Sequence, residues 1–266
     1  MKVLDLFSGI GGFSLGLERA GMTTVAFCEI EPYAQAVLRK HWPGVPIYED
    51  VRTLTAERLR ADGIDTVDLV CGGFPCQPWS DAGEQQGKDD HRHLWPEMLR
   101  IVQEIRPAWV IGENVAGFIR MALDDCCADL EAAGYEVQPV VIPACAVDAE
   151  HRRDRVWIIA HADRKQYKSR THEIGKQITK EFSSDASGLS WGYGVNDDVK
   201  ELRDGAEGGK TGSAIRPHQC WPPEPEMGRV AYGVSGGVDR LKGLGNAVVP
   251  QIPEIIGKAI MEVEKR

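Results

Sequence analysis

Short apolar runs alternate with amphipathic helical segments along the first 160 residues, and this alternation constrains the fold more than any other feature of the sequence. Strands that alternate with helices form βαβ units, which build a mostly parallel sheet covered by helices on both faces. No helix separates the last two apolar runs, so we expect an antiparallel hairpin at one edge of the sheet. The predicted strands are residues 3–7, 23–28, 47–48, 67–71, 109–112, 135–142 and 155–160.

The predicted helices have recognisable starts and stops. One begins at Pro32 and runs to residue 41, because proline is tolerated in the first turn of a helix. Others are expected over residues 94–105 and 121–133, and glycines follow the first and last helical segments at Gly21 and Gly134. Residues 163–228 are rich in Gly, Ser, Lys, Asp and Glu and show no sustained period. We therefore expect an α/β domain at 1–161, a small irregular region at 162–228, and a return to the first domain through a C-terminal helix at 229–266.

The composition limits the class of protein. The chain is 42% hydrophobic and 27% charged, as in ordinary globular domains, and it has no run of about 18 apolar residues that could span a membrane. Its seven cysteines are irregularly spaced and form no CxxC pair, which favours reduced thiols in the cytoplasm and no metal site. The net charge is −9, but residues 161–180 carry six Lys or Arg against two acids. That stretch is either a solvated loop or a contact to a phosphate backbone.

A glycine-rich turn, DLFSGIGGFSLG, follows the first predicted strand. Its glycines let the backbone approach a ligand, and the next helix offers free N–H groups. Glu29 ends the second strand, where an acid commonly binds ribose hydroxyls, and Asp50 follows the third. The pattern indicates an adenosine-containing cofactor, although a purely structural turn is an alternative, and it does not separate dinucleotides from S-adenosylmethionine.

Polar and reactive residues follow the later strands. Cys76 stands between Pro75 and Pro78 in a stiff loop after the fourth strand, which suits a nucleophile better than a structural turn cysteine. Glu113 ends the next strand and is expected at the same edge of the sheet. In HRRDR, alternation puts Arg153 and Arg155 on one face of a strand, unless this is only an exposed strand end.

The ordered succession DLFSGIGG, CEIEPYA, FPCQPWS, ENV, RRDR and GLGNAVVP resembles the cytosine-5 DNA methyltransferase family. The resemblance covers residues 1–160 and 229–260. It implies a Rossmann-like S-adenosylmethionine-dependent methyltransferase fold, with a catalytic and cofactor-binding domain at 1–161 and 229–266. The region at 162–228 corresponds to the family's variable target-recognition region.

The resemblance also implies the cofactor, S-adenosyl-L-methionine, with S-adenosyl-L-homocysteine as product. Phe7 would stack on the adenine, Glu29 would hold the ribose, and Ile30 would pack on the adenine. The other implied cofactor contacts are Ser8, Gly9, Gly11, Gly12, Asp50, Val51, Leu94, Asn246, Ala247 and Val248.

For catalysis, the resemblance implies that Cys76 attacks carbon-6 of a cytosine flipped out of double-stranded DNA. Glu113 would pair with the edge of the base, and Arg153 and Arg155 would contact the base and the nearby backbone. A monomer is expected, with a cognate restriction endonuclease as a partner that acts separately. The chain departs from the family pattern at His151, where the family usually has Gln.

Three other functions are compatible with parts of the sequence. One branch of the same family methylates transfer RNA with the same Cys and Glu, and a catalytically silent DNA-binding relative is a second possibility. A nicotinamide dehydrogenase would account for the glycine turn, but it has no use for FPCQP or ENV.

Overall fold

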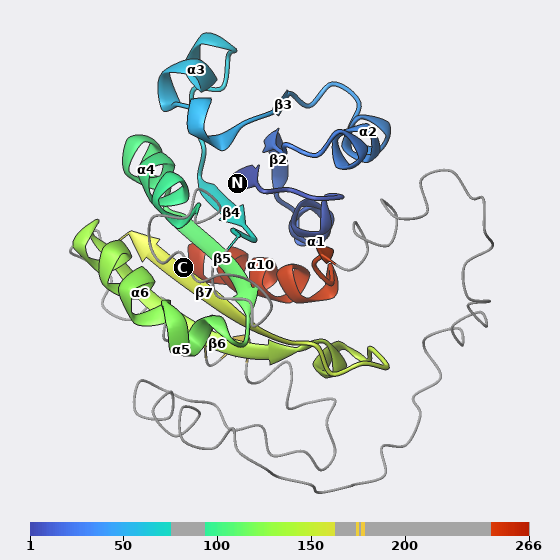
Figure 1. Ribbon diagram of the computed structural model, residues 1–266, viewed down its shortest axis with the longest axis vertical. Helices are drawn as coiled ribbons and strands as arrows, with labels where there is room; N and C mark the ends of the chain where they lie inside the picture. Colours follow the sequence, from blue (N-terminus) through green and yellow to red (C-terminus); the bar gives the residue numbers. More distant parts are fainter. Residues whose placement is uncertain (76–93, 163–173, 176, 179–245, 266) are drawn as a thin grey trace, which may run out of the picture.

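The computed structural model describes residues 1–75, 94–162, 174–175, 177–178 and 246–265 (Figure 1). Its centre is a seven-stranded sheet with the strand order β3-β2-β1-β4-β5-β7-β6. The strands are β1 (Lys2–Leu6), β2 (Thr23–Cys28), β3 (Ile47–Tyr48), β4 (Leu69–Gly72), β5 (Trp109–Val115), β6 (Tyr135–Pro143) and β7 (Asp154–Ala162). The helical elements are α1 (Gly12–Arg19), α2 (Pro32–His41), η1 (Val51–Thr53), α3 (Ala56–Ala61), α4 (Trp95–Ile105), α5 (Phe118–Met121), α6 (Leu123–Ala132), η3 (Ala144–Val147) and α10 (Gln251–Glu264).

The sheet is mostly parallel, as the sequence predicts. Strands β1 to β5 pair in parallel, whereas β7 is antiparallel to both β5 and β6. The predicted hairpin of the last two strands is therefore confirmed, with β6 at the edge. The later strand, β7, lies inside, and its run from Val156 to Ala160 is fully buried. A strand with so continuous an apolar run is stable only where both its faces are covered.

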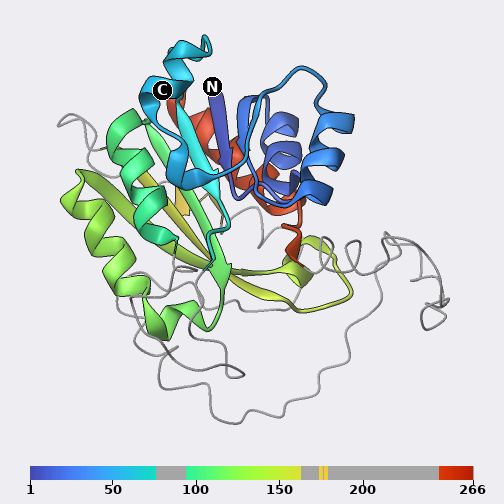
Figure 2. The same cartoon turned by 45° about the horizontal axis from the view of Figure 1, so that its top comes forward.

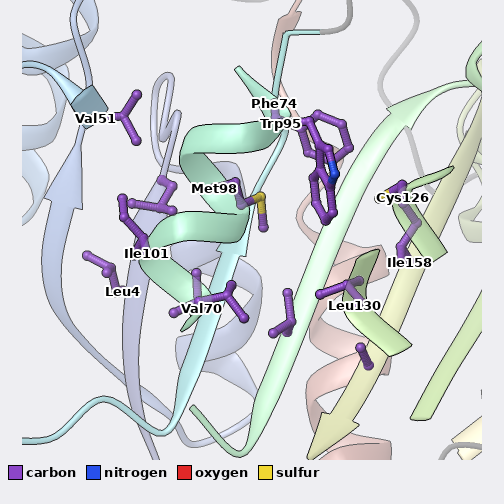
Figure 3. Packing of buried hydrophobic residues seen from close by; sticks show 14 of the residues in the cluster. Leu4, Val51, Val70, Phe74, Trp95, Met98, Ile101, Cys126, Leu130 and Ile158 are labelled. Atoms are coloured by element: carbon purple, nitrogen blue, oxygen red, sulfur yellow. The ribbon is translucent and has the colours of Figure 1, made fainter. Parts of the chain in front are cut away.

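Helices cover both faces of the sheet, and Figure 2 shows α1 and α10 on the side opposite α4 and α6. Leu4 and Leu6 of β1 face the α4 and α6 side, while Val3 faces α1 and α10, as expected from the alternation of side chains along a strand. Figure 3 shows the hydrophobic core on the α4 and α6 side of the sheet. In this core the ring centroids of Phe74 and Trp95 are 5.0 Å apart.

The C-terminal helix α10 packs back against α1, as predicted. Two glycines allow the close approach of these helices. A Cβ atom on Gly257 would lie 2.8 Å from the Cβ of Ala20, and one on Gly16 would collide with the carbonyl oxygen of Pro250. No helix in the described part of the chain is both long and apolar enough to cross a membrane.

Some boundaries differ from the sequence prediction. The helix expected at 121–133 is present as α6 but begins at Leu123, and a separate one-turn helix, α5, precedes it, because the backbone leaves the helical conformation at Ala122 (φ −152°). The short helix α3 has no strong apolar period and was not predicted. Within the region expected to recognise the target, the described residues Ile174 and Ile178 are buried in the core beside α1 and α10.

Candidate active site

A cavity of about 470 Å³ opens at the carboxyl ends of the parallel strands. Its walls come from the residues that end or follow five strands in succession: Phe7 after β1, Glu29 after β2, Asp50 after β3, Gly73 after β4, and Glu113 in β5. Open α/β sheets bind their ligands at this edge. The structure thus brings eight of the thirteen predicted cofactor residues and the predicted catalytic acid into one cavity, whereas Ser8, Gly11, Gly12, Ala247 and Val248 do not line it.

Glu29 links the glycine turn to the start of α2. Its buried carboxylate accepts a hydrogen bond from the N–H of Gly9 at 2.6 Å and another from the N–H of Glu31 at 2.8 Å. A carboxylate has about four lone-pair positions, so two stay available for ligand hydroxyl groups. The side chain is therefore held rigidly in the wall of the cavity and can still accept hydrogen bonds.

The turn after β1 has an unusual backbone. Phe7 has a φ of 53°, in the left-handed region that non-glycine residues rarely occupy, and its side chain lines the cavity. The hydroxyl of Ser8 donates to the carbonyl oxygen of Asp5 at 2.6 Å and is buried beneath the turn. Such strain persists only where the surroundings enforce it, and it often marks a functional site.

Two of the predicted cofactor glycines have a packing role in this structure. A Cβ atom on Gly11 would lie 2.6 Å from the ring of Trp42, and one on Gly12 would lie 2.6 Å from the carbonyl oxygen of Val248. Of the segment 246–248, Asn246 lines the cavity, whereas Val248 packs behind the turn. These glycines therefore allow the turn to approach Trp42 and the C-terminal segment closely.

Ile30, Asp50, Val51 and Leu94 also line the cavity. The Ile30 side chain is 59% exposed, so it offers apolar surface at the rim to a ligand ring. Hydrogen bonds from the side chain and backbone of Arg52 lower the pKa of the Asp50 carboxyl group, which keeps it ionised as an acceptor.

Glu113 and Arg155 form an ion pair at the other end of the cavity. The Nε of Arg155 lies 2.8 Å from Oε1 of Glu113, and the two side chains are 20% and 14% exposed. Burial raises the pKa of Glu113, and the charges of Arg155 and Arg153 offset only part of that rise. The arginine orients the carboxyl group, while burial favours its protonated form.

Arg153 connects this end of the cavity to the C-terminal segment. Its Nη2 donates to the carbonyl oxygen of Ala247 at 3.0 Å, and its backbone has a φ of 40°. Burial and the charge of Arg155 lower its pKa. Both arginines line the cavity, but Arg153 lies just before β7 and has a left-handed φ, so the alternation expected along a strand does not set its direction.

The sequence predicts no role for Asn114 and Gly73, yet both shape the end of the cavity that holds Glu113. The buried Asn114 amide donates to the carbonyl oxygen of Phe74 at 3.0 Å and so ties β5 to the segment that leads to Cys76. A Cβ atom on Gly73 would lie 3.1 Å from Oε2 of Glu113. Cys76 itself lies outside the described residues, and Pro75, just before it, lines the cavity.

The order of the strands and the cavity at their carboxyl edge define a Rossmann-like α/β protein with a ligand site in its usual place. A family model described as C-5 cytosine-specific DNA methylase matches residues 1–214. The chain belongs to the C-5 cytosine-specific DNA methylase family.

Individual relatives agree with this assignment. The chain is 37% identical over 169 residues to the type II methyltransferase M2.BsuMI of Bacillus subtilis, covering 60% of this chain and 42% of that protein. It is 46% identical over 162 residues to the type II methyltransferase M.NgoMIV of Neisseria gonorrhoeae, covering 59% of this chain and 50% of that protein. The chain thus spans about half the length of these relatives.

A solved structure also resembles this chain. It is a protein described as a DNA modification methyltransferase encoded within a prophage of Escherichia coli. It is 29% identical, with a TM-score of 0.53, and the match covers 61% of this chain and 47% of that one.

Proposed function

We propose that this chain is a DNA (cytosine-5) methyltransferase, which transfers a methyl group from S-adenosyl-L-methionine to carbon-5 of a cytosine flipped out of duplex DNA. The observation that carries the proposal is the Glu113–Arg155 pair, buried at one end of the cavity whose other end holds Glu29 and Phe7. One end suits a heteroaromatic base, and the other suits an adenosine group. Reaction at a base requires that the base leave the stacked duplex.

The residues present fit S-adenosylmethionine. The Glu29 carboxylate has lone pairs left for the ribose hydroxyls, and Phe7 and Ile30 offer apolar surface for the adenine. Asp50 and Val51 would lie beside the edge of that ring, and Leu94 and Asn246 also line the cavity. When bound, the cofactor supplies an electrophilic methyl group.

The chain's own residues would make carbon-5 reactive. The Cys76 thiolate adds to carbon-6, and the electron pair of the 5,6 double bond then becomes available at carbon-5. Glu113, protonated more readily because it is buried, donates a hydrogen bond to the ring nitrogen and stabilises the charge that develops there. After methyl transfer, a base removes the proton from carbon-5 and the thiolate leaves, which restores the double bond.

We also assign target recognition to the region at 162–228, and contact with the DNA backbone to the basic residues of 161–180. The six Lys and Arg in that stretch support a contact with phosphates. Ile174 and Ile178, which are buried beside α1 and α10, would anchor the region to the catalytic domain. A monomer and a separately acting restriction endonuclease complete the proposal.

Bisulfite sequencing of plasmid DNA from cells that express the chain tests this function directly. We expect 5-methylcytosine in one sequence context, and no methylation with Cys76→Ala, which should still bind S-adenosylhomocysteine. Methylation by Cys76→Ala at the wild-type rate would refute the mechanism. Transfer of labelled methyl groups to transfer RNA instead of duplex DNA would favour the RNA-modifying branch of the family, and no transfer to either would favour a silent relative.

A further inference from the structure

Arg100 lies in the middle of α4, and its guanidinium group donates hydrogen bonds to two acids and two backbone carbonyl oxygens. Its Nη2 donates to the carbonyl oxygens of Val51 and Leu54, both at 2.9 Å. Its Nε donates to Glu97 at 2.9 Å and its Nη1 to Glu104 at 2.6 Å. The two acids hold the guanidinium in one orientation, so that its Nη2 hydrogen-bonds to the backbone of residues 51–54.

The segment that Arg100 holds, residues 51–54, forms part of a wall of the cavity, and the side chains of Val51 and Leu54 also anchor it in the core. It follows β3, which has two residues and pairs only with β2 in the described sheet. Val51 is buried and lines the cavity, and Leu54 ends the η1 turn. The same helix makes a second contact just after this turn. Glu104 accepts a hydrogen bond at 3.0 Å from the N–H of Ala56, the first residue of α3.

We propose that Arg100 is a positioning residue that holds the wall at 50–54 at the distance an adenosine group requires. The proposal rests on the proposed function, because that function makes Asp50 and Val51 the contacts to the adenine edge. Among the described residues, Arg100 donates its side-chain hydrogen bonds to backbone carbonyls and acids, so we infer that it acts on the ligand through the wall. Leu94, the residue that precedes α4, lines the cavity as well, so the same helix follows one cavity residue and holds the wall formed by others.

Arg100→Lys is the informative substitution. It keeps the positive charge between Glu97 and Glu104, but a lysine ammonium lacks the planar fork that reaches both carbonyl oxygens. Arg58→Lys is the matched control, because Arg58 also pairs with an acid four residues further on, Asp62, at 3.0 Å. Arg58 is exposed and is not part of the cavity wall.

Calorimetric titration with S-adenosylhomocysteine and with adenosine measures the effect. We expect Arg100→Lys to weaken the binding of both ligands about tenfold, since both carry the group that this wall would contact, and Arg58→Lys to stay within about twofold. At saturating cofactor, kcat for methyl transfer should change by less than about threefold. Equal affinities of Arg100→Lys and the wild type would overturn the inference. A wild-type chain that binds neither ligand would overturn the proposed function, and the inference with it.

Hydrogen exchange of the ligand-free chain separates positioning from global stability. We expect peptides covering residues 50–56 to exchange about tenfold faster in Arg100→Lys, with β1 and β4 unchanged. Faster exchange throughout the sheet would show that Arg100 supports the fold as a whole, which contradicts the inference. Unchanged exchange at 50–56 would contradict it equally.

Discussion

Asp5 is a fully buried carboxyl group in β1, and its titration tests the packing beneath the glycine turn. Its Oδ2 accepts a hydrogen bond from the hydroxyl of Ser14 at 2.7 Å, which ties the strand to α1. Burial raises the pKa of Asp5 from 3.8 to about 7, the charge of Glu29 adds to the rise, and hydrogen bonds from Ser14 and Cys71 oppose it. Within the described part of the chain, Oδ1 has no partner that meets normal hydrogen-bond geometry.

The raised pKa makes stability fall as pH rises. Between pH 3.8 and about 7 the folded state keeps a proton that the unfolded chain has lost, so raising the pH through this range favours unfolding. Each pKa unit corresponds to about 1.4 kcal/mol, so the shift costs about 4 kcal/mol in full. About 2 to 3 kcal/mol of that cost arises between pH 5 and pH 8, and the effect levels off above pH 8.

Urea unfolding of the wild type and Asp5→Asn at several pH values between 5 and 8 measures this term. Asparagine has nearly the same shape and does not titrate, so contributions from all other groups cancel in the difference. We expect the free energy of unfolding of the wild type, relative to Asp5→Asn, to fall by about 2 to 3 kcal/mol across this range.

Asp62→Asn is the control. Asp62 is an exposed carboxyl group whose pKa is lowered by hydrogen bonds from Arg58 and Tyr48, so it is ionised in both states above pH 5. Its difference from the wild type should be flat between pH 5 and 8. A flat difference for Asp5→Asn as well would refute the claim that Asp5 is buried with a raised pKa.

Three further predictions concern the site and the helix contact. Glu113→Gln should slow methyl transfer roughly 100-fold or more while S-adenosylhomocysteine still binds, because glutamine cannot supply a proton; an unaffected rate would remove Glu113 from the mechanism. Gly73→Ala places a Cβ 3.1 Å from Oε2 of Glu113, so we expect about a tenfold loss of rate with little change in Tm, and a normal rate would show that the carboxylate can shift freely. Gly257→Ala should cost about 1 to 3 kcal/mol in urea unfolding, since its Cβ would lie 2.8 Å from that of Ala20, whereas Lys258→Ala on the exposed face should cost less than about 0.5 kcal/mol; equal losses would place the helix contact elsewhere.

The cavity is the part of the site that the sequence predicts well. Phe7, Glu29, Asp50 and Glu113 follow or end apolar runs of strand length, and parallel strands present their carboxyl ends at one edge. That edge was therefore foreseeable without knowledge of any contact. The roles of Gly11 and Gly12 were less accessible, because a glycine that approaches a ligand and a glycine that packs against Trp42 or Val248 look alike in sequence.

Contacts between segments far apart in the sequence could not be predicted without the structure. The guanidinium of Arg100 reaches a carbonyl oxygen 49 residues away, and that of Arg153 reaches one 94 residues away. Neither contact follows from a period of two or 3.6 residues, because such periods describe only which face of an element is buried. The ion pair of Glu113 with Arg155 likewise depends on β7 lying beside β5.

The sequence by itself determined the alternation of strands and helices, the parallel sheet and the edge at which chemistry would gather, since these follow from local patterns of apolar residues and from the geometry of βαβ units. Only the tertiary structure decided that β7 lies between β5 and β6, which residues brace the cavity walls, and which carboxyl groups are buried enough for their pKa to rise. Burial and long-range contacts are set by the packing of the whole chain, and that packing also sets the pKa of Glu113 and of Asp5.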